Sequence, residues 1–373
     1  MHRSRHHHSN LIRRLGAAVV IVAVALVADG TPAFAHSGAA DASNYVSEIT
    51  DPGHPDLQWQ VYGGDALIEL TNATGEELIV EGYTGEPYLK YVPGDGVFQN
   101  VHSPAVYYNT DRYANAPLPD IADPEAEPEW ERVADGDAYA WHDHRAHWMS
   151  PVPPSGIFSD PDTAQKVFDW SFIVRGTLDG SEHLFIVRGT LHWVPAVPWW
   201  PPVLALAVVF GGIALFAALR TRPQGDRWTG LARPVAAIIW VVMAANVVRT
   251  LDDIFAVPTA TGERITMAVT AAVTIAVIVA LTLVAWRGEL WGFLALIGAG
   301  VATWLLFGNA HSVILSGSQV VTALPVWIAR WVVAASFAVM VPVVIACAFA
   351  GRHFWQRSRS TVSETAAVPT PAG

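Results

Sequence analysis

The sequence predicts an extracytoplasmic all-β domain, an Ig-like or cupredoxin-like sandwich, followed by an α-helical transmembrane bundle of five spans. Three observations predict this. The chain is 52% hydrophobic and only 15% charged, whereas soluble domains carry about 25% charged residues. Its composition changes from polar and acidic to apolar near residue 198. Short alternating runs fill the first part, and apolar runs of membrane-spanning length fill the second.

Residues 1–35 have the features of a secretory signal peptide. Arg13 and Arg14 precede the apolar run "LGAAVVIVAVALVA", and Ala33 and Ala35 provide the small residues of a cleavage site. Cleavage after Ala35 would leave His36 as the first residue of the mature chain.

Residues 36–197 are expected to form the β-sandwich domain. Turn sequences such as "NATGEE", "PGDG" and "LDGSE" separate the apolar-polar runs, as in other all-β domains. The segment "FIVRGTL" occurs twice, at 172–178 and 185–191, and its two copies are expected to form a hairpin. The runs expected to be strands are "LQWQVY", "ALIELT", "ELIVEGY", "EPYLKYV", "EWERV", "DAYAWHDH", "VFDWSFIVRGTL" and "EHLFIVRGTLHWV".

Residues 198–351 are expected to form the transmembrane region, and 352–373 a disordered cytoplasmic tail. Trp199 and Trp200 suit the membrane–water interface where the spans begin. Each apolar segment approaches the length of about 20 residues that crosses the hydrocarbon core. The predicted spans are 202–219, 234–249, 265–286, 290–308 and 324–350.

The loop charges predict the orientation of these spans. The loop after the first span is "RTRPQGDRWTGLARP" and the tail begins "GRHFWQRSRS", so both basic segments belong inside. We therefore expect a multi-pass protein of a bacterial cell membrane, with its N-terminal domain outside and its C-terminus in the cytoplasm. A signal segment retained as a sixth span is the competing topology and keeps the same tail position.

The stretch "AYAWHDHRAHWMSP" at 138–151 concentrates histidines. His142 and His144 would share one face of a strand, where two imidazoles at this spacing can approach one metal ion. His147 would join them only if the strand ended or bulged near Arg145. On the opposite face, Asp143 and Arg145 are expected to form an ion pair. The alternative interpretation is a polar strand edge that happens to be rich in histidine.

The metal predicted for this cluster is copper. His36, if it is the mature N-terminus, offers its α-amine and Nδ1 as a chelate, and an imidazole from the cluster completes a set of nitrogen ligands. The only cysteine, Cys347, lies in an apolar run far from the histidines. Nitrogen ligands without thiolate suit Cu²⁺, which forms the most stable divalent complexes and favours tetragonal N/O geometry.

The order of signal peptide, mature "A|H" start, β-rich domain and multi-span region resembles the bacterial CopC/CopD-type copper proteins. It is also similar to YcnI-like exported proteins, which start with a metal-binding histidine. This resemblance implies a copper-handling role and His36 as a ligand. The chain departs from the pattern by lacking the usual CopC strand motif and by having fewer spans than CopD-type regions.

A few ionisable side chains lie near membrane depth, where such groups are costly and commonly functional. Arg249, Asp252 and Asp253 lie at the outer end of the second predicted span, His311 at the outer end of the fourth, and Arg330 within the fifth. Arg330 is expected to pair with Asp252 or Asp253 across helices.

The sequence thus favours a metal-binding envelope protein whose partners are a metal ion, the lipid bilayer and a further membrane or envelope protein. The alternative function is a structural or interaction protein of the envelope without a metal site. The net charge of −11 argues against nucleic-acid binding. No nucleophile motif indicates an enzyme.

Overall fold

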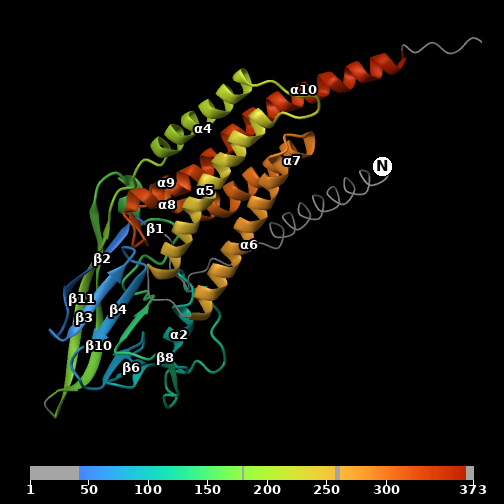
Figure 1. Ribbon diagram of the computed structural model, residues 1–373. Coiled ribbons are helices and arrows are strands. Elements are labelled where there is room, and N and C mark those ends of the chain that lie inside the picture. The colour runs from blue at the N-terminus through green and yellow to red at the C-terminus, as the bar shows by residue number, and fades with distance from the viewer. Residues whose placement is uncertain (1–41, 179, 257–260, 367–373) are drawn as a thin grey trace, which may run out of the picture.

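A computed structural model describes residues 42–178, 180–256 and 261–366. The chain forms a β-rich region followed by a bundle of long apolar helices that stands on one end of the sheets (Figure 1). This confirms the predicted order of a β-rich part and five membrane-length helices.

A seven-stranded antiparallel sheet forms most of the β-rich region. The two copies of "FIVRGTL" pair in it, with Phe172 opposite Val187, so the predicted hairpin is confirmed. In spatial order the strands are β2 (Tyr45–Asp51), β11 (Ser181–Trp193), β10 (Gln165–Leu178), β5 (Leu78–Glu81), β6 (Pro87–Val92), β7 (Gly96–Asn100) and β8 (Trp130–Ala134).

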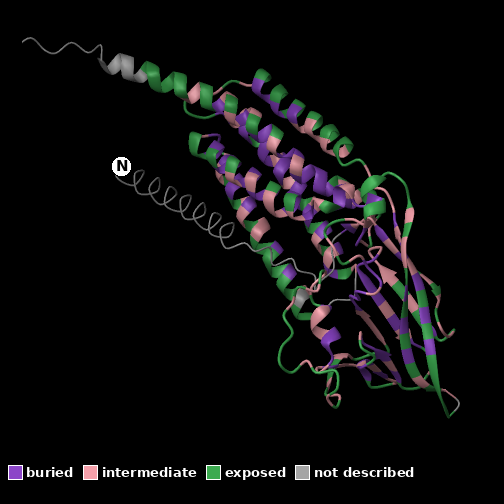
Figure 2. Ribbon diagram, turned by 180° about the vertical axis from the view of Figure 1, so that it is seen from behind, coloured by how far each residue is buried: buried purple, intermediate pink, exposed green. Residues whose placement is uncertain are grey.

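A smaller antiparallel sheet comprises β3 (Leu57–Tyr62), β4 (Leu67–Asn72) and β9 (Ala138–Trp141). Leu70 of this sheet belongs to the same buried cluster as Leu89 and Phe172 of the large sheet. One apolar core therefore joins the two sheets, and the alternating burial along their strands is visible in Figure 2.

Two strands of the large sheet, β2 and β7, are absent from the sequence prediction. In β2 the buried positions include Ser47 beside Tyr45, so the strand lacks the apolar alternation by which strands are recognised. In β7 only five residues lie between turn sequences. Two short helices, α2 (Pro104–Tyr108) and α3 (Ser155–Ser159), connect strands.

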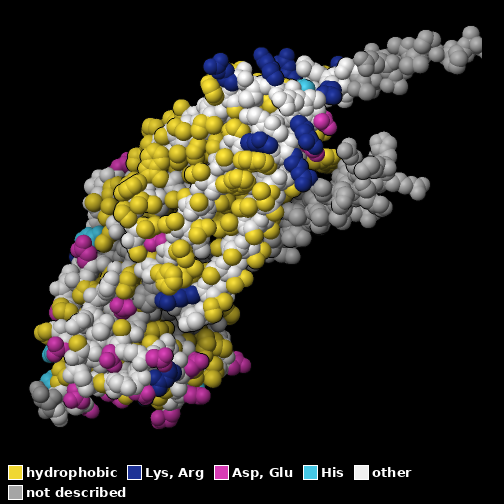
Figure 3. Space-filling view, viewed as in Figure 1, with side chains coloured by type: hydrophobic (Ala, Val, Ile, Leu, Met, Phe, Trp, Pro, Cys, Tyr) yellow, Lys and Arg dark blue, Asp and Glu magenta, His cyan; other side chains and the backbone are white. Residues whose placement is uncertain are grey.

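The helical part contains five helices that are long and apolar enough to cross a membrane, as predicted. Its exposed side chains are mainly apolar over the length of the helices (Figure 3). The helices are α4 (Trp200–Arg220), α5 (Thr229–Phe255), α6 (Thr261–Ala285), α7 (Leu290–Thr303), α8 (Val313–Ser316), α9 (Val326–Ala338) and α10 (Met340–Ala366); a π turn (η1, Trp304–Gly308) and a 3₁₀ turn (η2, Asn309–His311) follow α7.

The last helices differ from the sequence prediction in two ways. The fifth span breaks at Val339 and restarts as α10, because Pro342 in the first turn of α10 lacks an N–H and clashes with the preceding turn. The predicted disorder from residue 352 is wrong up to Ala366, because α10 continues that far. Its "FWQRSR" sequence contains the straight-chain residues Gln356, Arg357 and Arg359, which favour a helix.

A short segment of the helical part completes the β-rich part. Strand β1 (Ala42–Ser43) pairs with β12 (Gln319–Val320), which lies between α8 and α9. The adjacent Val321 packs against the turn that leads into β4, where a Cβ on Gly63 would lie 2.3 Å from the Val321 side chain. Gly63 also has a φ of +61°, so this junction requires glycine for both space and conformation.

Candidate metal centre

The three histidines of "HDHRAH" come together because strand β9 ends at Trp141, immediately before them. The main-chain N–H of Ala146 then donates to the carbonyl of Asp143 at 3.1 Å, which closes a turn. This turn returns the chain so that His147 lies beside His142. The strand thus ends before Arg145, which is the condition under which His147 was expected to join the other two histidines. The expectation that His142 and His144 share a strand face is wrong, because both lie beyond the strand.

The three imidazoles form one compact, buried group. Their ring centroids are 4.1 Å apart for His142–His147, 5.3 Å for His142–His144 and 5.2 Å for His144–His147. One nitrogen from each ring lies within 4.8 Å of the other two. An ion with metal–nitrogen bonds of about 2.1 Å would hold neighbouring nitrogens about 3.0 Å apart in tetragonal geometry and about 3.4 Å apart in tetrahedral geometry. The rings would therefore move inward by a small distance on binding.

Main-chain carbonyls determine which ring nitrogens are free. Nδ1–H of His142 donates to the carbonyl of Ala66 at 2.8 Å, so the Nε2 atom of His142 carries a free lone pair. Nε2–H of His144 donates to the carbonyl of Asp111, also at 2.8 Å, so the lone pair of His144 is on Nδ1. A carbonyl can only accept, so both tautomers follow from these contacts. Ligating histidines in metal sites typically use their second nitrogen in this way.

Two of the three histidines have buried ring nitrogens that lack a side-chain partner. Among the described residues, Nε2 of His142 makes no hydrogen bond, and the ring nitrogens of His147 have only the main chain of Trp148 beside them. His147 is only 1% exposed and His142 only 3%. A buried polar atom without a partner costs about 1–3 kcal/mol, so this arrangement is unfavourable unless a ligand satisfies it.

Burial keeps all three rings neutral, which is the form that binds a metal. It lowers the pKa of His142 to about 4, with a further contribution from the charge of Arg112. Burial also lowers the pKa of His144. The pKa of His147 falls furthest, because burial disfavours its charged form and because that form would be repelled by a proton on His142, by the charge of Arg112 and by a proton on His144. Protons therefore do not compete for these nitrogens at neutral pH.

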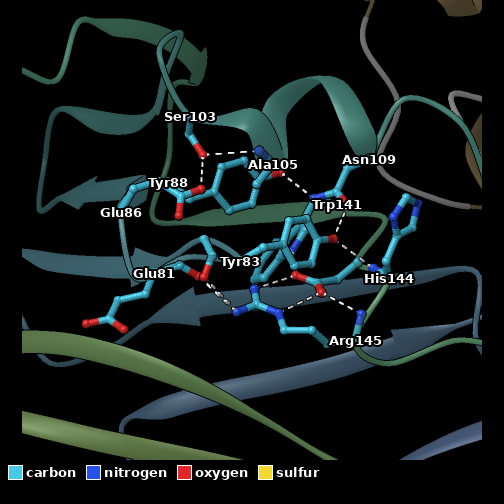
Figure 4. A network of polar contacts seen from close by, with 12 residues as sticks. Glu81, Tyr83, Glu86, Tyr88, Ser103, Ala105, Asn109, Trp141, His144 and Arg145 are labelled. Carbon is cyan, nitrogen blue, oxygen red and sulfur yellow. Dashed lines mark hydrogen bonds and ion pairs between the residues drawn. The ribbon is translucent and has the colours of Figure 1, made fainter. Parts of the chain in front are cut away.

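A buried ion pair holds the turn that carries the histidines (Figure 4). Arg145 donates to both carboxylate oxygens of Asp143, from Nε at 2.9 Å and from Nη2 at 2.8 Å, so the predicted ion pair is confirmed. Burial alone would raise the pKa of Asp143, but the charge and hydrogen bonds of Arg145, with a bond from Trp141, hold it below its usual value. Arg145 also donates to the carbonyl of Glu81 at 3.0 Å and lies over the ring of Phe172.

These pKa shifts predict that mild acid destabilises the metal-free protein. Between pH 6.5 and about 4 the unfolded chain binds a proton at His142, while the folded chain does not. Protonation therefore favours the unfolded state, and the free energy of unfolding decreases as the pH falls below 6.5. We expect the lowered pKa of His142 alone to reduce the free energy of unfolding by about 1.6 kcal/mol between pH 6.5 and 5. Urea unfolding at both pH values measures it. Replacement of His142 by Gln should reduce the difference; an equal pH dependence in the two proteins would contradict the prediction.

His36 lies outside the residues that the structure describes, so its role as an amino-terminal ligand stays a prediction. No sequence signal indicates the two carbonyl acceptors, which lie 76 residues from His142 and 33 residues from His144. Any residue type can present a main-chain carbonyl, so no motif marks these positions.

The membrane polar cluster is only partly as expected. Arg249 lies one helical turn from Asp252 and Asp253 and pairs with both carboxylates. The predicted pairing of Arg330 with these aspartates is wrong, because its Nη2 donates to the carbonyl of Gly317 at 2.7 Å, beyond the end of α8. His311 is buried at the end of the turn that follows α7.

Asp252 links this cluster to the segment that leads into α9. Its carboxylate accepts hydrogen bonds from the hydroxyl of Thr322 at 2.6 Å and from the main-chain N–H groups of Ala323 and Leu324 at 2.8 and 3.1 Å. The neighbouring Val321 packs against Ala66, whose carbonyl holds His142. The histidine cluster therefore lies close to the junction between sheets and helices.

Comparisons of the chain with protein-family models, with curated proteins and with solved structures gave no match.

Proposed function

We propose that this chain is a membrane-anchored metal-binding protein that holds Cu²⁺ at His142, His144 and His147. The observation that carries the proposal is the meeting of three buried, neutral imidazoles whose free nitrogens lie within 4.8 Å of one another. A purely structural cluster of buried histidines would use these nitrogens in hydrogen bonds within the protein.

The donor set supports copper over other metals. All three donors are imidazoles, and the cluster contains no thiolate or carboxylate. A nitrogen-only site binds Cu²⁺ more tightly than Zn²⁺ or Ni²⁺ according to the divalent stability order. The resemblance to CopC/CopD-type and YcnI-like proteins points to the same metal. The role proposed is copper handling rather than catalysis.

The charge distribution supports an outer position for the site. On the face drawn in Figure 3, most Lys and Arg side chains lie at the end of the bundle remote from the sheets, and Asp and Glu side chains lie mainly over the sheets. Under the positive-inside rule, the basic end faces the cytoplasm. The histidine cluster would then lie outside a bacterial membrane, just above its surface.

Metal titration of the purified, metal-free full-length protein in detergent tests this proposal. We expect one equivalent of Cu²⁺ to bind tightly, with an EPR spectrum that shows nitrogen hyperfine couplings, and to outcompete Zn²⁺. Preference for Zn²⁺ at the same stoichiometry would keep the site but refute copper. Absence of tight binding by any divalent metal would refute the proposed function and favour an envelope interaction protein.

A further inference from the structure

An ion pair stands beside both carbonyls that orient the histidines. Asp65 immediately precedes Ala66, the acceptor for His142, and Arg112 immediately follows Asp111, the acceptor for His144. The two side chains meet, with Nη2 of Arg112 donating to Oδ2 of Asp65 at 2.8 Å. One salt bridge thus joins the two chain segments on which the orientation of two rings depends.

The pair is well protected from water. The side chain of Asp65 is fully buried and that of Arg112 is 14% exposed. A charge-assisted hydrogen bond in such surroundings has a defined geometry and resists exchange with solvent. Residues 65 and 112 come from different parts of the fold, the turn before β4 and the loop after α2. Among the ion pairs of the described residues, the Asp65–Arg112 pair is the one that links these two segments.

We propose that Asp65 and Arg112 are positioning residues of the metal centre. By tying residues 65–66 to residues 111–112, they fix the spacing of the two carbonyls and, through them, the orientation of the His142 and His144 rings. This inference rests on the proposed function, because it assumes that the three histidines bind a metal. Groups that orient metal ligands in this way typically change affinity about 10- to 100-fold when replaced.

A purely electrostatic role makes a different prediction. Arg112 carries a positive charge close enough to lower the pKa of each histidine. If charge alone mattered, Arg112→Gln would strengthen the binding of a cation and Asp65→Asn would weaken it. If the pair positions the ligands, both replacements weaken binding, and the double variant is no weaker than the single ones.

The test measures the Cu²⁺ affinity and EPR spectrum of the full-length protein with Asp65→Asn, Arg112→Gln and both together. Arg112→Lys, which keeps the charge but not the planar fork, is a second variant in case the others fold poorly. Asp51→Asn is the matched control, because Asp51 pairs with Arg188 at 2.9 Å in the same region but is exposed to solvent. Melting curves without metal show that each variant is folded.

We expect both single variants to bind Cu²⁺ about 10- to 100-fold more weakly, with altered nitrogen couplings, and the control to match the unmodified protein. Opposite effects of the two single variants, or unchanged affinity and spectra, would overturn the positioning role while the metal site stood. An unmodified protein that binds no metal would overturn this inference together with the proposed function.

Discussion

Replacement of His147 by alanine is expected to weaken Cu²⁺ binding by roughly 100- to 1,000-fold. A four-ligand structural metal site contributes about 10–16 kcal/mol of binding free energy, so one ligand accounts for roughly 3–4 kcal/mol. His147 has the largest expected effect because its buried ring has no side-chain hydrogen-bond partner in the described structure and lies 4.1 Å from the ring of His142. Competition titration of the full-length protein against a chelator of known affinity measures the loss.

The control for this variant is His183→Ala. His183 is an exposed histidine of β11 that stacks on Phe185 and takes no part in the cluster. Its replacement should leave the affinity unchanged. His147→Leu, which fills more of the vacated space than alanine, separates loss of a ligand from collapse of the site. Tight binding retained by both His147 variants would refute a centre built on this residue.

Replacement of Asp143 by alanine is expected to cause the largest loss of stability in the β-rich part, about 3–5 kcal/mol of unfolding free energy. It would leave the largely buried guanidinium of Arg145 without its carboxylate and remove the acceptor for Nε1 of Trp141. The main-chain N–H of Arg145 would also lose its bond to Asp143, at 3.0 Å, which helps to form the turn. Urea unfolding of the metal-free protein in detergent measures the change.

Two further variants make this prediction specific. Asp143→Asn keeps an acceptor for Trp141 and for the turn but removes the charge. Its free energy of unfolding should therefore fall by less than that of the alanine variant. Asp51→Asn breaks an exposed pair and should change the unfolding free energy by no more than about 1 kcal/mol. An alanine variant as stable as the Asp51 variant would show that the buried pair does not hold the turn.

The architecture could be predicted from sequence because its signals are local. Membrane spans follow from apolar length, and most strands follow from alternation between turn sequences. The exceptions have physical causes, since Ser47 interrupts the apolar pattern of β2 and Pro342 divides a span whose hydropathy is continuous. Pairing across helices leaves no local signal: the sequence predicts a pair between Arg330 and Asp252 or Asp253, but Arg249 pairs with both aspartates from one turn away.

The metal centre shows the same division. The spacing of His142, His144 and His147 singled out three residues that the structure brings together, but the strand end that unites them depends on how the Asp143 side chain bonds to its own turn. The orientation of the rings depends on carbonyls of Ala66 and Asp111, which are contributed by distant loops. Such main-chain acceptors are fixed by the tertiary structure and leave no pattern in the sequence.

The pairing of β1 with β12 imposes an order on biosynthesis. Asn44 and Ser318, which bond to each other beside this pairing at 2.8 Å, are 274 positions apart in the chain. At a translation rate of about 5–20 residues per second, Ser318 is synthesised roughly 15–55 s after Asn44. During that interval the turn beside Ala66 lacks Val321, its packing partner. The turn that presents the Ala66 carbonyl to His142 can therefore reach its final packing only after the ribosome has added the segment before α9, when synthesis of the chain is nearly complete.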